Sequence, residues 1–230
     1  MKIDFYLHFH TIFGQTIALS GNLSSLGAND ATKALPLTYL SDDYWHTAIE
    51  IDPSEYNFIE YRYLFNNEKK ERKKEGEKDR LIDLKKITRD LILIDTWNDE
   101  SYFENVFFTA PFKEIFFRDA KKVKLKKEEK ATHTFKVKAP LISNNESICL
   151  VGSDEKLNNW DISNPVLLNR KGSWWTVNID LSAAVFPISY KYGVYNYKKE
   201  SFTRFEDGDN RVLNNNGCEN KLTIIHDGFA

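Results

Sequence analysis

The side chains most often used in catalysis are scattered along this chain. Motifs typical of serine hydrolases, P-loop enzymes, zinc proteases and dinucleotide-binding proteins are all missing from the sequence. His8 and His10 alternate on one strand-like segment, but no third metal ligand lies near them in the sequence. The other histidines stand far apart, at His46, His133 and His226. We therefore predict a binding chain, with no catalytic residue, no metal and no cofactor.

Two aromatic residues stand among polar residues, where a loop is expected. Trp160 follows two asparagines, and Phe205 precedes the turn-forming run Glu206-Asp207-Gly208-Asp209-Asn210. Aromatic residues in such loops are poor candidates for a hydrophobic core. Exposed rings can stack on the apolar face of a sugar, while nearby Lys, Glu and Asn side chains can bond its hydroxyl groups. The pattern favours a carbohydrate site.

An internal repeat organises the elements that must position these residues. Leu19-Ser20-Gly21-Asn22 corresponds to Leu150-Val151-Gly152-Ser153 at a spacing of 131 residues, and Arg80 corresponds to Arg211 at the same spacing. Tyr61-Arg62-Tyr63 corresponds to Tyr190-Lys191-Tyr192 at a spacing of 129. A spacing that stays nearly constant along the chain, with differences of only a few residues, is typical of a duplicated domain. We predict one copy over 1–95, a connecting segment over 96–130 and a second copy over 131–228.

Each copy contains several short segments in which apolar and polar residues alternate. Residues 3–9, 134–138 and 175–179 show this pattern, and Gly, Asn, Asp and Pro residues separate such segments. No long segment has the period of an amphipathic helix. The sequence predicts an all-β protein built from two immunoglobulin-like antiparallel β-sandwich domains in tandem.

Composition excludes several kinds of partner. The formal charge of the 230-residue chain is −2, which argues against nucleic-acid binding through a basic surface. No apolar run is long enough to span a membrane. Asp4 interrupts the N-terminus where a signal peptide would be apolar, and Cys149 and Cys218 fit a reducing compartment. We expect a cytoplasmic protein without nucleic-acid or membrane partners.

The second copy resembles the family-20 carbohydrate-binding modules, the starch-binding domains. The resemblance runs from Ile148 to Arg211 as V-G-S-x-x-x-L-x-x-W-D, then W-W, Y-K-Y and F-E-D-G-D-N-R. It implies a site for α-1,4-glucan or malto-oligosaccharide made by Trp160, Lys191, Phe205 and Asn210, with Glu206 as a further hydrogen-bonding group. The family usually has Trp where Phe205 stands. A Phe still stacks but lacks the indole N–H, so the affinity is expected to be lower.

The first copy keeps the scaffold of the resemblance and loses this site. Asn29, Lys74 and Asp79 align with Trp160, Phe205 and Asn210 in that order, and only Arg62 keeps the basic character of Lys191. The family also has a second glucan site, for which the first copy offers Phe13 and Tyr39. In this hypothesis each copy supplies one of the two glucan sites of the family. The alternative for Phe13 is that it packs beneath its own loop.

The tandem arrangement resembles the N-terminal part of 4-α-glucanotransferases of the plant cytosolic disproportionating-enzyme type. This implies a catalytic domain of the amylomaltase type in cis beyond Ala230, which these modules would target to glycogen, starch or heteroglycan. The alternative is a protein-interaction or dimerisation module whose sugar sites have decayed.

Overall fold

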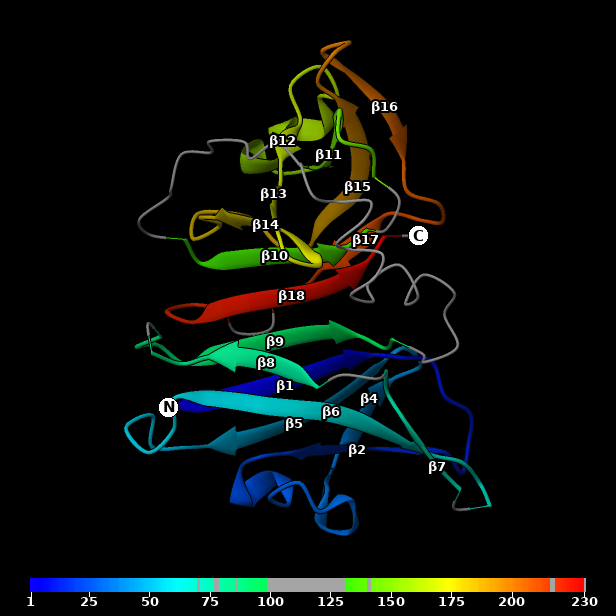
Figure 1. Cartoon of the computed structure of the whole chain (residues 1–230), viewed down its shortest axis with the longest axis vertical. Coiled ribbons are helices and arrows are strands. Elements are labelled where there is room, and N and C mark those ends of the chain that lie inside the picture. Colours follow the sequence, from blue (N-terminus) through cyan, green and yellow to red (C-terminus); the bar gives the residue numbers. More distant parts are fainter. Residues whose placement is uncertain are drawn as a thin grey trace. The chain divides into compact units, whose positions relative to one another are not determined.

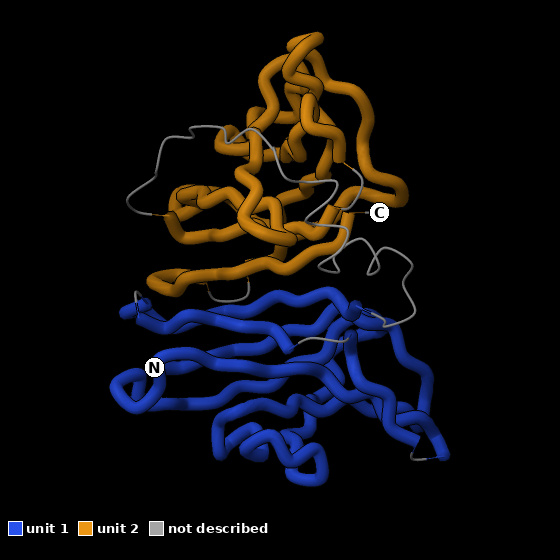
Figure 2. Tube along the Cα trace, viewed as in Figure 1, with its two compact units in different colours: residues 1–102 blue, residues 103–230 orange. Residues whose placement is uncertain are grey.

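The computed structural model describes residues 1–69, 71–76, 79–85, 87–98, 131–139, 142–215 and 218–229. The chain divides into two compact units, Met1–Tyr102 and Phe103–Ala230 (Figure 2). Most of the connecting segment expected over 96–130 lies outside the described residues, and the finer domain limits stay a prediction. Among the described residues, no helix is long and apolar enough to cross a membrane.

The first unit contains two sheets. One has the strand order β9-β1-β5-β4, and in the other β3-β2-β6-β7 are neighbours while β8 also pairs with β6 (Figure 1). Two short 3₁₀ helices follow β2. The bounds are β1 Lys2–His8, β2 Thr16–Gly21, η1 Ser24–Leu26, η2 Ala31–Lys33, β3 Leu35–Pro36, β4 Thr38–Ser41, β5 Tyr44–Glu50, β6 Phe58–Asn66, β7 Arg72–Lys74, β8 Arg80–Asp83 and β9 Leu91–Thr96.

The second unit repeats the strand topology of the first, with the single 3₁₀ helix η4 in place of η1 and η2. Its sheets run β18-β10-β14-β13 and β12-β11-β15-β16, with β17 also pairing with β15. The bounds are β10 His133–Lys138, β11 Glu146–Gly152, η4 Glu155–Trp160, β12 Val166–Leu167, β13 Asn169–Lys171, β14 Trp174–Ile179, β15 Ile188–Asn196, β16 Ser201–Phe205, β17 Arg211–Leu213 and β18 Leu222–Gly228. The predicted all-β class and tandem sandwiches are confirmed. Each unit also has one parallel pair, β1 with β9 and β10 with β18.

Alternating strands supply the core between the two sheets of each unit. Phe5 of β1 is fully buried and meets the ring of Tyr61 on β6 edge to face, with the ring centroids 5.2 Å apart. Phe135 of β10 meets Tyr190 on β15 in the same way, at 5.3 Å. Because Tyr190 and Tyr192 both point into the core, Lys191 between them points outward, as alternation along a strand requires.

The repeated Gly and Leu residues fix where the first helical turn of each unit packs. A Cβ atom on Gly152 would overlap with the Leu157 side chain and with the backbone oxygen of Ser189. Gly21 has the same relation to Leu26 in the first unit. Glycine therefore lets η4 pack closely against the end of β11, which positions the loop that carries Trp160.

Candidate carbohydrate-binding site

Trp160 stands at the end of η4 on an unusual stretch of backbone. Asn158, Asn159 and Trp160 all have positive φ, at 59°, 47° and 64°. Asparagine adopts this left-handed region more readily than most residues, whereas Trp seldom does. The Asp154 carboxylate caps the start of η4 by accepting a hydrogen bond from the Lys156 N–H, at 2.8 Å. The Trp160 side chain remains half-buried on this tightly turned loop. Backbone strain of this kind is often found where a side chain must be presented to a ligand.

Lys191 joins β15 to the loop that follows β16. Its Nζ donates a hydrogen bond to the carbonyl oxygen of Gly208 at 2.5 Å and lies 5.9 Å from the centroid of the Phe205 ring. Phe205 is 37% exposed, and Asn210 is exposed on the same loop. The structure therefore brings Lys191 and Phe205 together beside the loop of Asn210. Val151, near the end of the strand that leads to η4 and Trp160, pairs with Lys191.

Glu206 lies beneath this loop rather than on its surface. The residue is 3% exposed, and its carboxylate accepts hydrogen bonds from Arg211 Nε at 3.0 Å and Arg211 Nη2 at 2.9 Å. It also accepts one from the backbone N–H of Tyr192 at 3.0 Å. Both carboxylate oxygens are thus bonded within the protein. This placement favours support of the loop over the sugar contact that the sequence suggested.

A buried network extends from Glu206 into the core. Arg211 Nη1 donates to Asp227 Oδ1 at 3.1 Å, and the hydroxyls of Tyr190 and Tyr192 both donate to Asp227 Oδ2 at 3.0 Å. Burial alone would lower the pKa of Arg211, but Asp227 and Glu206 raise it above its usual value. Burial, followed by the Asp227 charge, raises the pKa of Tyr192 well above its usual value. Arg211 therefore stays charged and the tyrosine stays neutral.

The first unit contains the same network although it lacks the aromatic loop residues. Arg80 donates to Glu75 and, at 3.2 Å, to Asp95, whose other oxygen accepts hydrogen bonds at 2.8 Å from both Tyr61 and Tyr63. Because this network recurs where no sugar platform is expected, it belongs to the scaffold. Glu206 is the counterpart of Glu75 in it.

An ion pair stands in the first unit where the second unit has Lys191 and Asn210. Arg62 Nε donates to the carboxylate of Asp79. Lys74 is exposed at the position of Phe205, so that unit has no ring there for stacking. The two copies therefore differ at these positions in their contacts as well as in their residue types.

Phe13 and Tyr39, the expected second site, present accessible rings. Phe13 is fully exposed beside Gly14, so it does not pack beneath its own loop. Tyr39 is 47% exposed, and its ring meets that of Trp45 edge to face with the centroids 5.4 Å apart. Its hydroxyl donates to Asp42 at 2.6 Å, and this bond raises the pKa of Tyr39. The described ring contacts include none that joins Phe13 to Tyr39.

Comparison with known proteins connects this geometry to a family. The model of the family described as the starch binding domain matches residues 1–90 and again 130–224. The chain belongs to the starch-binding domain family. That membership supports carbohydrate binding, and the two matched segments correspond to the two copies of the repeat.

Individual relatives are similar to this chain at low sequence identity, and in several cases only a small part of the relative is covered. The 4-alpha-glucanotransferase DPE2 of Oryza sativa subsp. japonica is 26% identical over 208 residues, which cover 84% of this chain and 22% of that protein. This starch-binding chain thus spans about a fifth of that relative. The Hypocrea jecorina glucoamylase is 19% identical, with 43% of this chain and 17% of that chain covered and a TM-score of 0.39. The family 20 module of the Pseudomonas saccharophila STB07 maltotetraose-forming amylase is 18% identical, with coverages of 40% and 97% and a TM-score of 0.34.

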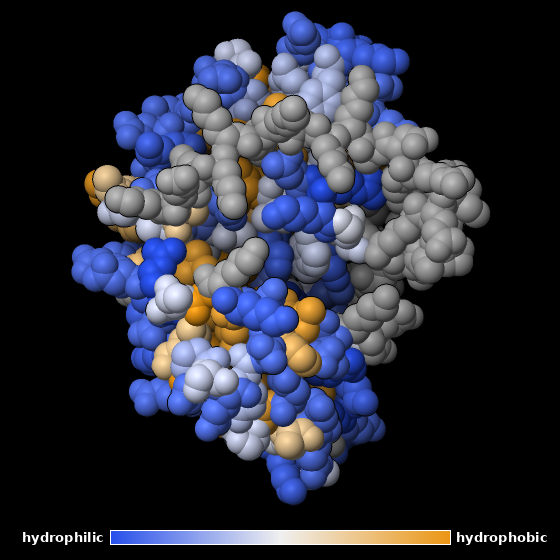
Figure 3. All heavy atoms as spheres, turned by 60° about the vertical axis from the view of Figure 1, so that its left-hand side comes forward, coloured by the Kyte–Doolittle hydropathy of each residue, from blue (hydrophilic) through white to orange (hydrophobic). Residues whose placement is uncertain are grey.

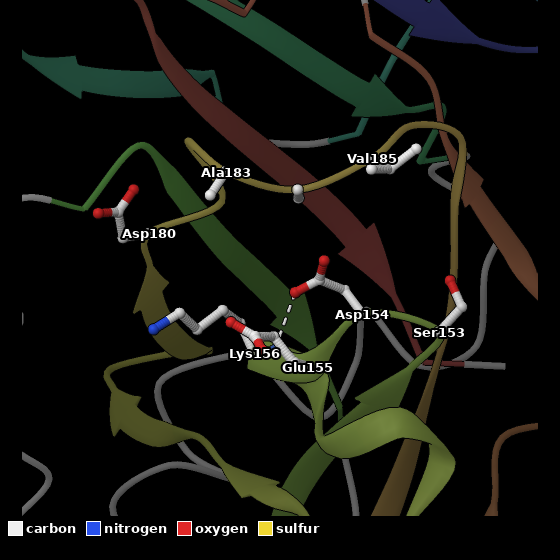
Figure 4. A pocket seen from close by; sticks show the side chains of 8 residues that line it. Ser153, Asp154, Glu155, Lys156, Asp180, Ala183 and Val185 are labelled. Atoms are coloured by element: carbon white, nitrogen blue, oxygen red, sulfur yellow. Dashed lines mark hydrogen bonds between the residues drawn. The ribbon is translucent and has the colours of Figure 1, made fainter.

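A separate pocket in the second starch-binding unit has a different character. It lies between the start of η4 and the segment before β15, as Figure 4 shows. Its lining, among the residues that the structure describes, is polar or aliphatic and is made by Ser153, Asp154, Glu155, Lys156, Asp180, Ala183, Ala184 and Val185. This lining differs from that of Phe205 and Lys191. The face of the molecule in Figure 3 is likewise mostly hydrophilic, with scattered hydrophobic residues.

One aromatic neighbour of the site was missed in the sequence. Phe202 of β16 lies against Phe205, with the ring centroids 4.5 Å apart and the ring planes at 55°. The spacing of three between these residues does not place them on one face of a regular strand. Val194 pairs with Arg204 and the next residue, Tyr195, pairs with Phe202, so β16 has one extra residue, Thr203; this bulge shifts the register and brings the two rings together. Only the aromatic content of Ser201–Phe205 could have drawn attention to it.

Proposed function

We propose that this chain binds α-1,4-glucan without acting on it, through a platform in the second unit made by Trp160, Lys191, Phe205 and Asn210. The observation that carries the proposal is the exposed Phe205 ring beside the Lys191 ammonium in a member of the starch-binding domain family. Stacking of rings on sugar faces excludes water, and charged or amide groups at the edge select hydroxyl-bearing ligands.

In this proposal Glu206 supports the loop and does not contact the sugar. By holding Arg211 and the Tyr192 N–H, it fixes the start of the loop that carries Asn210. Lys191 fixes the middle of the same loop through Gly208. A loop that is ordered before the sugar arrives loses less conformational entropy on binding.

The first unit contributes a second contact through Phe13 and Tyr39. Two weak sites on one chain raise the avidity for a long polymer by about 10²–10⁴ when both bind the same molecule. A short oligosaccharide gains nothing from the second site. Glycogen, starch or a soluble heteroglycan is therefore the expected ligand class.

We further propose that in the full-length protein these units target a 4-α-glucanotransferase domain to its polysaccharide in the cytoplasm. The similarity to the rice enzyme supports this, because it extends over 84% of this chain while leaving most of that relative unmatched. Catalysis would then belong to the unmatched part, and this chain would raise the local concentration of the substrate.

The test is calorimetric titration of β-cyclodextrin, which has the curvature of an α-1,4-glucan, into the chain and its variants. Trp160→Ala should remove most of the binding heat, and Phe13→Ala should remove the residual heat. Phe58→Ala is the matched control, because Phe58 is exposed but lies outside both proposed sites. No binding by the unmodified chain would refute the proposal.

The Arg62–Asp79 pair favours a second candidate for the first unit, as a protein-interaction or dimerisation module. Light scattering coupled to size exclusion separates the two. Self-association without any glucan binding would support the interaction module, and a monomer that loses part of its cyclodextrin binding on Phe13→Ala would exclude dimerisation as the role of the first unit.

A further inference from the structure

The sheet face that carries Lys191 continues beyond Phe205 as an aromatic surface. Tyr192 and Val194 on β15 point into the core, so Gly193 between them faces outward, like Lys191. The ring of Phe202 lies over the outward side of Gly193. Phe205 pairs directly with Gly193 and touches Phe202. Lys191, Phe205 and Phe202 therefore share one face of β15 and β16, which lie side by side in Figure 1.

Glycine at position 193 is what gives Phe202 this place. A Cβ atom there would overlap with Cε2 of Phe202 and lie 2.9 Å from the carbonyl oxygen of Arg204. Any other residue would push the ring away from the sheet. The absence of a side chain lets the ring lie against the backbone, where it remains half-buried and keeps part of its surface in contact with solvent.

The first unit provides an internal comparison, because it has lost this surface together with the sugar site. Leu64 pairs with Lys74 where Gly193 pairs with Phe205. Asn66 pairs with Arg72 where Tyr195 pairs with Phe202. The glycine and both rings are thus present together in one copy and absent together from the other. Since the shared buried network is retained in both copies, the outer surface differs for a reason other than stability of the fold.

We propose that Phe202 is a third stacking ring, which extends the glucan platform along β16 by one glucosyl unit beyond Phe205. The inference rests on the proposed function of the second unit. Because the planes of Phe202 and Phe205 differ by 55°, the two rings offer differently oriented faces. Successive glucosyl units of a curved α-1,4-glucan are also inclined to one another. Phe202 therefore selects longer chains and adds nothing for a sugar that ends at Phe205.

The test measures how affinity depends on chain length. Maltotriose, maltopentaose and maltoheptaose are titrated calorimetrically into the chain carrying Phe13→Ala, which removes the proposed contribution of the first unit. Phe202→Leu, which keeps apolar packing on Gly193, is added to this background, and Phe58→Ala is the control. We expect Phe202→Leu to weaken maltoheptaose binding about three- to tenfold, as loss of one aromatic contact does, and to leave maltotriose binding unchanged.

The outcomes separate this inference from the function on which it rests. The inference about Phe202 is overturned if Phe202→Leu leaves the ratio of maltoheptaose affinity to maltotriose affinity unchanged. This holds whether both affinities stay the same or both fall by the same factor. An equal fall would mean that Phe202 only supports Phe205. If the background chain binds none of the sugars, the proposed function of the second unit itself fails. Gly193→Ala, which displaces the ring without removing it, should reproduce the loss for maltoheptaose.

Discussion

Replacing Glu206 by Gln tests whether this residue supports the loop or contacts the sugar. The substitution keeps the shape of the side chain and removes the charge that faces Arg211 Nε and Nη2 at 3.0 and 2.9 Å. Arg211 retains Asp227 at 3.1 Å, so its charge is left partly compensated. Breaking a buried ion pair costs about 3–5 kcal/mol, and the remaining Asp227 partner places Glu206→Gln near the lower limit.

A loss of about 3 kcal/mol lowers the melting temperature of a domain of this size by roughly 12–24 °C. Scanning calorimetry measures this shift, and amide exchange identifies the unit that unfolds. Glu75→Gln is the matched variant in the first unit, since Glu75 has the same role beside Arg80. It should lower the stability of that unit by a similar amount and leave cyclodextrin binding at Trp160 unchanged.

The result that would refute this reasoning is specific. If Glu206→Gln melts like the unmodified chain but binds β-cyclodextrin much more weakly, Glu206 contacts the sugar directly and its buried bonds contribute little. Equal destabilisation by Glu206→Gln and Glu75→Gln, with normal binding well below the melting temperature, establishes the supporting role.

Three further predictions concern affinity, avidity and pH. Phe205→Trp should strengthen β-cyclodextrin binding severalfold in calorimetry, because a larger ring covers more of the sugar; unchanged affinity would argue against stacking at this position. Glycogen should bind much more tightly per site than maltoheptaose in the unmodified chain and lose that advantage in Phe13→Ala; equal affinities would contradict a two-site mode. Burial lowers the pKa of His133 to about 4, below the usual value of 6.5. Its stabilising effect is therefore present above pH 6.5 and lost as the pH falls toward 4, where the unfolded chain binds the extra proton. Urea unfolding of the second unit should show this decline, and His133→Gln should flatten it; an unchanged pH profile in that variant would exclude His133 as the source.

Sequence patterns were sufficient to predict the fold because its determinants are visible within the chain. Alternation in residues 3–9 predicts a strand, and the match of Gly21 with Gly152 belongs to the repeat that predicts two copies of one domain. The outward orientation of Lys191 followed from the same alternation. The strand pattern depends on residues a few positions apart and the repeat depends on matching segments of the same chain, and a single sequence displays both directly.

The details of the site depend on contacts that sequence spacing does not show. Glu206 belongs to a polar turn, and its sequence context predicts a surface residue. In the structure the loop folds back over β15, and the Glu206 carboxylate accepts hydrogen bonds from Arg211 and from the Tyr192 N–H. In a regular strand the side chains of Phe202 and Phe205 would point to opposite faces, and only the bulge in the β15–β16 pair places them on the same face. The left-handed backbone at Trp160 likewise could not be predicted from its residue type, because Trp seldom adopts this conformation.

The duplicated network of Arg, Glu, Asp and two Tyr residues has a consequence for how such a protein can change. It holds each sandwich together from the inside, so mutations on the outer face of β6 or β15 leave the fold intact. Under the proposed function, one copy can therefore lack the platform of Trp160, Lys191, Phe205 and Asn210 while the other copy carries it. The first unit keeps the frame of that platform, onto which Trp, Lys, Phe and Asn at positions 29, 62, 74 and 79 could be grafted by protein engineering.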